Sequence, residues 1–146
     1  MKPIFLLADD DIDDRELFCE ALGTVDPSIT CYCADNGRVA LHMLDSKQPS
    51  EYPHLIFLDI NMPVMNGWEC LVQLKRSEAY RHIPVFIYTT SSHQREANIA
   101  FDLGADCFFT KPAEYNELKS ILKIIANNIG GDWVSAISHF DNIKSR

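Results

Sequence analysis

The sequence predicts an α/β fold with a doubly wound, five-stranded parallel sheet and helices on both of its faces. Five short apolar segments alternate with five segments of helical periodicity along the 146 residues. Parallel strands need crossover connections, and helices that cover both faces of a sheet supply them. A chain of this length is expected to form one main domain with a sizeable core.

The expected strands are short apolar runs that end at polar residues. They are placed at residues 4–8, 30–34, 54–58, 85–88 and 107–109. The expected helices carry apolar residues every three to four positions. They are placed at residues 13–22, 39–44, 67–77 and 94–103, and along the apolar stripe from Leu118 to Ile129, with Gly104 positioned to end the fourth helix.

The residues after the fifth helix form a separate segment in this interpretation. Residues 1–129 are assigned to the main domain and residues 130–146 to a C-terminal extension. Two glycines stop the preceding helix, Asp132 can serve as an N-cap, and four apolar residues then share one helical face. These are Trp133, Val134, Ile137 and Phe140. We expect a short amphipathic helix that packs either on its own domain or against a partner.

Composition and charge argue against several classes of protein. A formal net charge of −8 without a basic stripe does not suit a nucleic-acid-binding protein. No apolar run approaches membrane-spanning length, and the first residues turn acidic too early for a secretory signal. Five cysteines, an odd number, favour a reducing compartment over a disulfide framework. We therefore expect a cytoplasmic protein without membrane insertion.

Two of the cysteines alternate on the second expected strand. Cys31 and Cys33 therefore share one face of the sheet. A metal-binding role is conceivable, but no second cysteine or histidine pair completes a zinc ligand set. Buried thiols are the simpler interpretation.

Reactive side chains gather where the expected strands end. Asp9 and Asp10 follow the first strand, Asp59 follows the third, Thr89 follows the fourth and Lys111 lies just beyond the fifth. In open α/β sheets, ligands bind outside the carboxyl ends of the strands, where the strand order switches. The sequence therefore predicts one site at this edge.

The three carboxylates at this edge indicate a metal ion. Converging carboxylates repel one another, and a hard divalent cation relieves that repulsion. Mg²⁺ takes oxygen ligands and is commonly held by one or two carboxylates plus phosphate oxygens. We expect Asp10 and Asp59 to bind Mg²⁺ directly, Asp9 to bind it through a water, and the backbone carbonyl of Asn61 to complete the protein ligands. Mn²⁺ could substitute.

The same arrangement suits phosphoryl transfer, which depends on positioning and on stabilising charge at the phosphoryl oxygens. Asp59 is the expected phosphoacceptor and would form an acyl phosphate. The metal ion, the Lys111 ammonium and the Thr89 hydroxyl are suitable partners for three phosphoryl oxygens. Acids in the first turn of a helix are often caps, which is how we interpret Asp13 and Asp14.

This ordered set of residues resembles the receiver domain of bacterial two-component systems, and the resemblance covers nearly the whole chain. Single-domain response regulators, some of them associated with bacterial phytochrome kinases, are the most similar type. The matching residues are Asp9, Asp10, Asp59, Thr89 and Lys111, with the segments Asn61-Met62-Pro63 and Asn66-Gly67 after the phosphoacceptor. The resemblance implies a flavodoxin-like sheet with the strand order 2-1-3-4-5.

The resemblance also implies a function. A sensor histidine kinase would donate the phosphoryl group, and phosphorylation-dependent contacts with an unknown downstream protein, or a homodimer, would carry the output. Thr89 and Phe108 would form the switch, and the peptide bond between Lys111 and Pro112 would be cis. The chain would not be an enzyme beyond its own phosphorylation and autodephosphorylation. An alternative is a phosphorelay intermediate or phosphate sink that passes the group to another protein.

Three other classes fit less well. An aspartyl-phosphate phosphohydrolase usually has an acid two residues after its nucleophile, where this chain has Asn61. A phosphorylation-independent adaptor would have lost an acid or the lysine. A flavin-binding protein of flavodoxin type would have a glycine- and hydroxyl-rich phosphate loop after the first strand, where this chain has acids.

Overall fold

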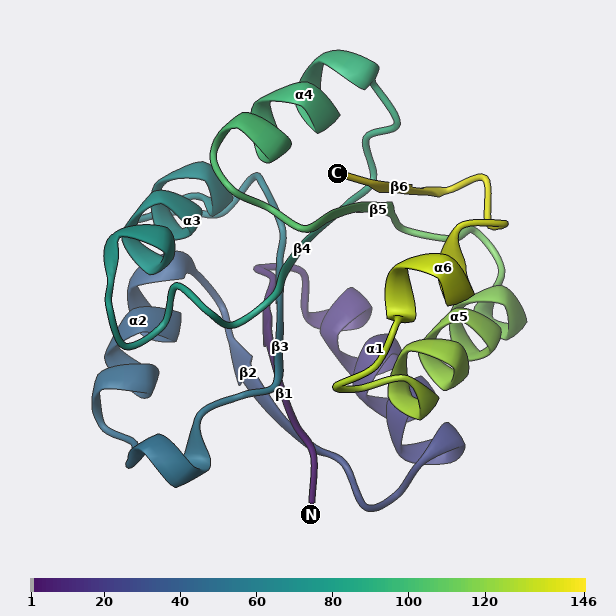
Figure 1. Ribbon diagram of the computed structural model, residues 1–146, viewed down its shortest axis with the longest axis horizontal. Coiled ribbons are helices and arrows are strands. Elements are labelled where there is room, and N and C mark those ends of the chain that lie inside the picture. Colours follow the sequence, from purple (N-terminus) through teal and green to yellow (C-terminus); the bar gives the residue numbers. More distant parts are fainter. Residues whose placement is uncertain (1) are drawn as a thin grey trace.

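A six-stranded sheet forms the centre of the computed structural model, which describes residues 2–146 (Figure 1). Its strand order is β2-β1-β3-β4-β5-β6, so the expected order of the first five strands is confirmed. These five are parallel: β1 (Ile4–Ala8), β2 (Thr30–Ala34), β3 (Leu55–Leu58), β4 (Val85–Thr89) and β5 (Cys107–Thr110). The sixth strand, β6 (Ile143–Ser145), is antiparallel to β5 and was not expected.

Helices cover both faces of the sheet, as predicted (Figure 1). One face carries α1 (Ile12–Val25), α5 (Tyr115–Asn127) and α6 (Trp133–Ile137). The other carries α2 (Gly37–Asp45), α3 (Gly67–Arg76) and α4 (Gln94–Asp102), and the short 3-10 helix η1 (Pro49–Glu51) precedes β3. Among residues 2–146, no helix is both long enough and apolar enough to cross a membrane.

Alternating side chains of the strands supply two apolar layers. In β1, Phe5 and Leu7 point into the layer beneath α1 and α5, whereas Leu6 and Ala8 point into the layer beneath α2, α3 and α4. This is the two-residue period of a strand that is buried on both faces. All four residues of β3 are buried. The sheet therefore holds its carboxyl edge rigidly between two packed layers.

Side-chain caps set where α1, α2 and α3 begin. Asp11 accepts a hydrogen bond from the Asp14 backbone, Asn36 caps α2, and Asn66 caps α3. Such caps satisfy backbone N–H groups that have no partner within the helix. They explain why α1 and α2 start earlier than apolar periodicity alone indicates. Gly104 follows α4 with a φ of 103°, a left-handed conformation that suits its expected role.

The C-terminal extension packs on its own domain. Helix α6 begins after Asp132, whose side chain caps it as expected. The Trp133 ring lies against Phe86, with ring centroids 5.0 Å apart, and Ile137 is fully buried. Strand β6 then pairs with β5. Of the two alternatives for the apolar face of the extension, the structure shows contact with its own domain.

Candidate functional site

The carboxyl ends of the strands bring the predicted acids and the lysine together. The Lys111 Nζ lies 2.7 Å from the Asp9 Oδ2 and 3.2 Å from the Asp59 Oδ2. Carboxylate oxygens of Asp9, Asp10 and Asp59 all lie within 4.8 Å of one another. Residues separated by up to 102 positions in sequence therefore form one cluster.

Backbone contacts fix Asp9 at the end of β1. Its side chain is fully buried, and its Oδ1 accepts a hydrogen bond from the Asp11 backbone at 3.0 Å. Its own backbone N–H donates to the Ala34 carbonyl in line with β2. The Arg15 guanidinium donates to the Asp9 carbonyl at 2.6 Å, which ties the first turn of α1 to this position. Asp10, next in sequence, is exposed and borders the cluster from the solvent side.

Asp59 is held in line with β3. Its backbone N–H donates to the Ala8 carbonyl, and its Oδ1 accepts a hydrogen bond from the Ile60 backbone at 2.8 Å. Burial raises the pKa of Asp59 to about 6; the Lys111 charge opposes this rise and the neighbouring Asp9 adds to it. The carboxyl group is therefore balanced between its charged and neutral forms near pH 6 and is mostly charged at neutral pH.

Lys111 binds a third carboxylate that sequence reasoning missed. Its Nζ lies 2.8 Å from the Asp14 Oδ2. Burial alone would lower the pKa of Lys111, but hydrogen bonds with Asp14 and Asp9 and the charge of Asp59 raise it, so the ammonium stays charged. We expected Asp14 only as a first-turn acid of α1. The feature of the sequence that could have indicated this contact is the position of Asp14, about one helical turn after Asp9 and Asp10.

The predicted cis peptide bond is wrong. Residues 2–146 contain no cis peptide bond, so Lys111 and Pro112 are joined in trans. The Lys111 backbone N–H donates to the Thr89 carbonyl at 2.6 Å. From this anchored position the side chain reaches the acids with the trans bond, which is also the intrinsically favoured isomer before proline.

The remaining predicted site residues lie around the cluster. Thr89 is almost fully buried, and its Oγ1 accepts a hydrogen bond from the Ser91 backbone at 3.3 Å. Phe108 is fully buried in the layer beneath α4, and Asn61 is exposed in the loop after β3, two residues beyond Asp59. The switch role of the first two and the ligand role of the third stay predictions.

The chemistry of the cluster fits a hard cation. Its three acids, Asp9, Asp10 and Asp59, offer only oxygen ligands, and one of them reaches solvent. Oxygen ligands of this kind suit Mg²⁺ and Mn²⁺ better than soft metals.

Comparison with known proteins now decides the family. A model of the response regulator receiver domain matches residues 5–123 of the chain. The chain belongs to the response regulator receiver family. As a member of this family it is a receiver of two-component signalling, and the expected resemblance is confirmed.

Two curated relatives illustrate the similarity. This receiver is 29% identical over 140 residues to the response regulator Rcp1 of Synechocystis sp.. The aligned residues cover 92% of this chain and 91% of that protein. It is 31% identical over 134 residues to the two-component response regulator ARR9 of Arabidopsis thaliana, covering 78% of this chain and 56% of that protein.

Solved structures of receivers agree with this fold. The phosphorylated cyanobacterial phytochrome response regulator RcpA superposes with a TM-score of 0.79 at 28% identity, covering 92% of this chain and 96% of that one. The Mn²⁺-bound form of Rcp1 superposes with a TM-score of 0.73 at 27% identity, covering 86% and 92% of the two chains.

Proposed function

We propose that this receiver accepts a phosphoryl group from a sensor histidine kinase onto Asp59, in a Mg²⁺-dependent reaction, and signals through phosphorylation-dependent protein contacts. The observation that carries this proposal is the convergence of Asp59, Asp9, Asp10 and Lys111 at one edge of the sheet. Similarity to RcpA, which has been solved in a phosphorylated form, supports it.

Asp59 is the nucleophile in this proposal. One of its carboxylate oxygens attacks the phosphorus of a phosphohistidine, so that a P–O bond forms while the P–N bond to the histidine breaks. The product is an acyl phosphate on Asp59 and a free histidine on the donor. Hydrogen bonding of Oδ1 to the Ile60 backbone holds the carboxylate in one orientation during the attack.

Asp10 and Asp59 would bind the metal ion directly, Asp9 would bind it through a water, and the Asn61 carbonyl would be a further ligand. Mg²⁺, or Mn²⁺ in its place, would supply positive charge to the phosphoryl oxygens. Lys111 supplies a second positive charge, because its ammonium already lies within hydrogen-bond distance of the Asp59 Oδ2. The Mn²⁺-bound structure of Rcp1 supports a divalent cation in this role.

Thr89 and Phe108 transmit the change in this proposal. The Thr89 hydroxyl donates a hydrogen bond to a phosphoryl oxygen, which shifts the turn that Ser91 forms with it. Ser91 also donates to the Glu96 carboxylate of α4 at 2.6 Å and accepts, at its carbonyl, a bond from Thr110 of β5. Movement of Thr89 therefore reaches α4 and β5, and Phe108 of β5 is packed in the layer beneath α4.

The test is phosphorylation by a small donor. With Mg²⁺ and acetyl phosphate, intact mass spectrometry should detect one added phosphoryl group on the wild type and none on Asp59→Asn. Asp13→Asn is the matched control, because Asp13 is an exposed acid of α1 outside the cluster. Equal phosphorylation of wild type and Asp59→Asn, or phosphorylation that persists in EDTA, would overturn the proposal.

A further inference from the structure

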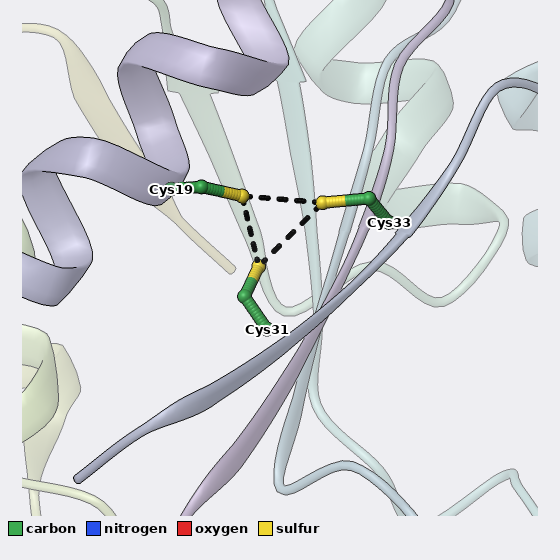
Figure 2. A group of neighbouring side chains, drawn as sticks. All are labelled: Cys19, Cys31 and Cys33. Atoms are coloured by element: carbon green, nitrogen blue, oxygen red, sulfur yellow. Dashed lines mark hydrogen bonds between the residues drawn. The ribbon is translucent and has the colours of Figure 1, made fainter. Parts of the chain in front are cut away.

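The site formed by Asp9, Asp10, Asp59 and Lys111 is called the acid site below. A second cluster of side chains that can bind metals lies between α1 and β2. Cys19 of α1 meets Cys31 and Cys33 of β2, and Figure 2 shows the three sulfur atoms pointing toward one another. The Sγ of Cys19 lies 3.2 Å from that of Cys33 and 3.6 Å from that of Cys31, and the third separation is 4.0 Å. All three are free thiols.

The fold explains how the cluster forms. Cys31 and Cys33 alternate on β2 and share one face, as the sequence predicted, and that face lies toward α1. The interpretation of both as buried thiols is wrong for Cys33, which is exposed. Cys19 lies on α1 next to the buried Phe18, and its thiol is directed toward the two thiols of β2. Periodicity did not reveal this third ligand, because its partners depend on how α1 docks. Cys33 is exposed and the other two are half-buried, so solutes can reach the cluster.

The spacing of the sulfur atoms suits a thiophilic metal ion. Thiolates bind Zn²⁺ at about 2.3 Å with tetrahedral geometry, which places neighbouring sulfurs roughly 3.8 Å apart. The observed separations, 3.2 to 4.0 Å, bracket that value. Small rotations of the side chains would therefore produce three corners of a tetrahedron, and the fourth corner is left for water.

The arrangement of the three sulfur atoms also favours a bound metal ion over simple packing, because all three lie within reach of one ion. A metal ion uses all three sulfurs at once, whereas a disulfide would pair two and leave the third thiol unpartnered.

We propose that Cys19, Cys31 and Cys33 form a soft-metal site that binds one Zn²⁺ ion through three thiolates, with water as the fourth ligand. Up to three S–H bonds break as three Zn–S bonds form, and the protons pass to the solvent. The ion joins α1 to β2, the strand at one end of the sheet. This site is independent of the phosphoacceptor and uses ligands that the acid site does not.

The test is titration of the full chain with Co²⁺ and then Zn²⁺, in a phosphine reductant and with excess Mg²⁺ to occupy the acid site. The wild type should bind one equivalent of Co²⁺ with a thiolate-to-metal charge-transfer band, which Zn²⁺ then displaces. Cys19→Ser, Cys31→Ser and Cys33→Ser should each weaken Zn²⁺ binding by more than the roughly 10- to 100-fold typical of outer-shell partners.

Matched controls use the other two cysteines. Cys70 and Cys107 are buried in the core away from the cluster, and the variant Cys70→Ala/Cys107→Ala should bind Zn²⁺ like the wild type. A second measurement avoids substitution: Zn²⁺ should protect Cys19, Cys31 and Cys33 of the wild type from alkylation, as read by peptide mass spectrometry.

Three results would overturn the proposal. The first is a reduced wild type that shows no charge-transfer band after Co²⁺ is added. The second is unchanged Zn²⁺ affinity in the variant with serine at all three positions. The third is a wild type that takes up no Zn²⁺ but loses two hydrogens between Cys19 and Cys33 on treatment with peroxide, which would make the cluster a redox pair instead.

Discussion

Lys111 is the residue on which the charge balance of the acid site depends. Its side chain is 8% exposed and contacts Asp9, Asp14 and Asp59, of which Asp9 is fully buried. A buried carboxylate is costly unless a partner of opposite charge compensates it. One ammonium group offsets several negative charges here, so the metal-free site retains an excess of negative charge. That excess is what a divalent cation would neutralise.

The raised pKa of Asp59 leads to a prediction about stability in EDTA. Because the folded-state pKa, about 6, exceeds the usual value of 3.8, the folded protein binds this proton more tightly than the unfolded chain. The contribution of this proton to the free energy of unfolding is fully present below about pH 4 and is lost as the pH rises through 6. Asp59→Asn cannot ionise, so it should be more stable than the wild type at pH 7.5, by about 1–2 kcal/mol after solvent screening.

Urea unfolding at pH 4 and pH 7.5 measures this difference. The advantage of Asp59→Asn should be largest at pH 7.5 and should shrink toward zero at pH 4. Asp13→Asn, at an exposed acid outside the cluster, is the control and should show little change between the two pH values. An equal advantage at both pH values would show that ionisation of Asp59 is not its cause.

Which site residues could be predicted depends on where they lie in their elements. Asp9, Asp59 and Lys111 follow strands, and parallel strands bring their carboxyl ends to one edge whatever the details of packing. Asp14 and Cys19 lie on α1, where the direction of a side chain depends on how the helix rotates against the sheet. Their contacts with Lys111 and with the β2 thiols therefore could not be read from spacing alone.

At the scale of elements, the junction of β3 and α3 depends on close backbone approach. A Cβ added at Gly67 would lie 2.1 Å from the Asp59 carbonyl oxygen and 3.0 Å from the Ile60 Cα. The Gly67 N–H donates to the Ile60 carbonyl at 2.9 Å. In the same loop Val64 has a φ of 67°, an unfavourable conformation for a β-branched residue. The start of α3 is thus in direct contact with the backbone of Asp59, the proposed phosphoacceptor.

Gly67→Ala should therefore be strongly unfavourable. The methyl group meets backbone atoms that cannot rotate away, so α3 or Asp59 must shift. We expect a loss of about 2–4 kcal/mol in the free energy of unfolding, within the range of severe single substitutions. In the fraction of Gly67→Ala molecules that is folded, phosphorylation by acetyl phosphate should be slower than in the wild type.

Gly23→Ala is the matched control, because Gly23 lies in α1 and a Cβ there meets nothing within 4 Å. It should stabilise the protein by about 0.5–1 kcal/mol. Urea unfolding of both variants checks the pair. Similar stability of Gly67→Ala and the wild type would mean that the junction relaxes easily, contrary to this account.

Element boundaries were predicted less well than element types. The five parallel strands and their helices follow apolar patterns that buried elements require. Strand β6 consists of three residues, Ile143, Lys144 and Ser145, which are too few to establish an alternating pattern. Its pairing arises because α6 returns the chain to the edge of β5, and that is a property of the packed molecule.

At the scale of the whole molecule, the C-terminal extension completes the core. Ile137 is fully buried and Ile143 is 7% exposed, and Trp133 covers Phe86. Truncation after Asn128 should lower the free energy of unfolding by at least about 3 kcal/mol, because each buried aliphatic side chain contributes roughly 1.5–3 kcal/mol. Urea unfolding of the truncated and full chains measures the loss.

The control for truncation is Val134→Ala, at an exposed position of α6. It should change the free energy of unfolding by less than about 0.5 kcal/mol. A truncated protein as stable as the full chain would show that α6 and β6 contribute nothing to the fold.

The proposed homodimer is tested separately, by sedimentation of the full chain with and without beryllofluoride.

The antiparallel pairing of β6 has a consequence for aggregation. Without it, β5 would end the sheet with the exposed backbone of an apolar strand, Cys107–Thr110, and such edges template the addition of strands from other molecules. With it, the terminal strand is three residues long and carries Lys144 at its centre. Short, charged edge strands resist intermolecular sheet growth. The extension therefore protects this end of the sheet from polymerisation at high concentration.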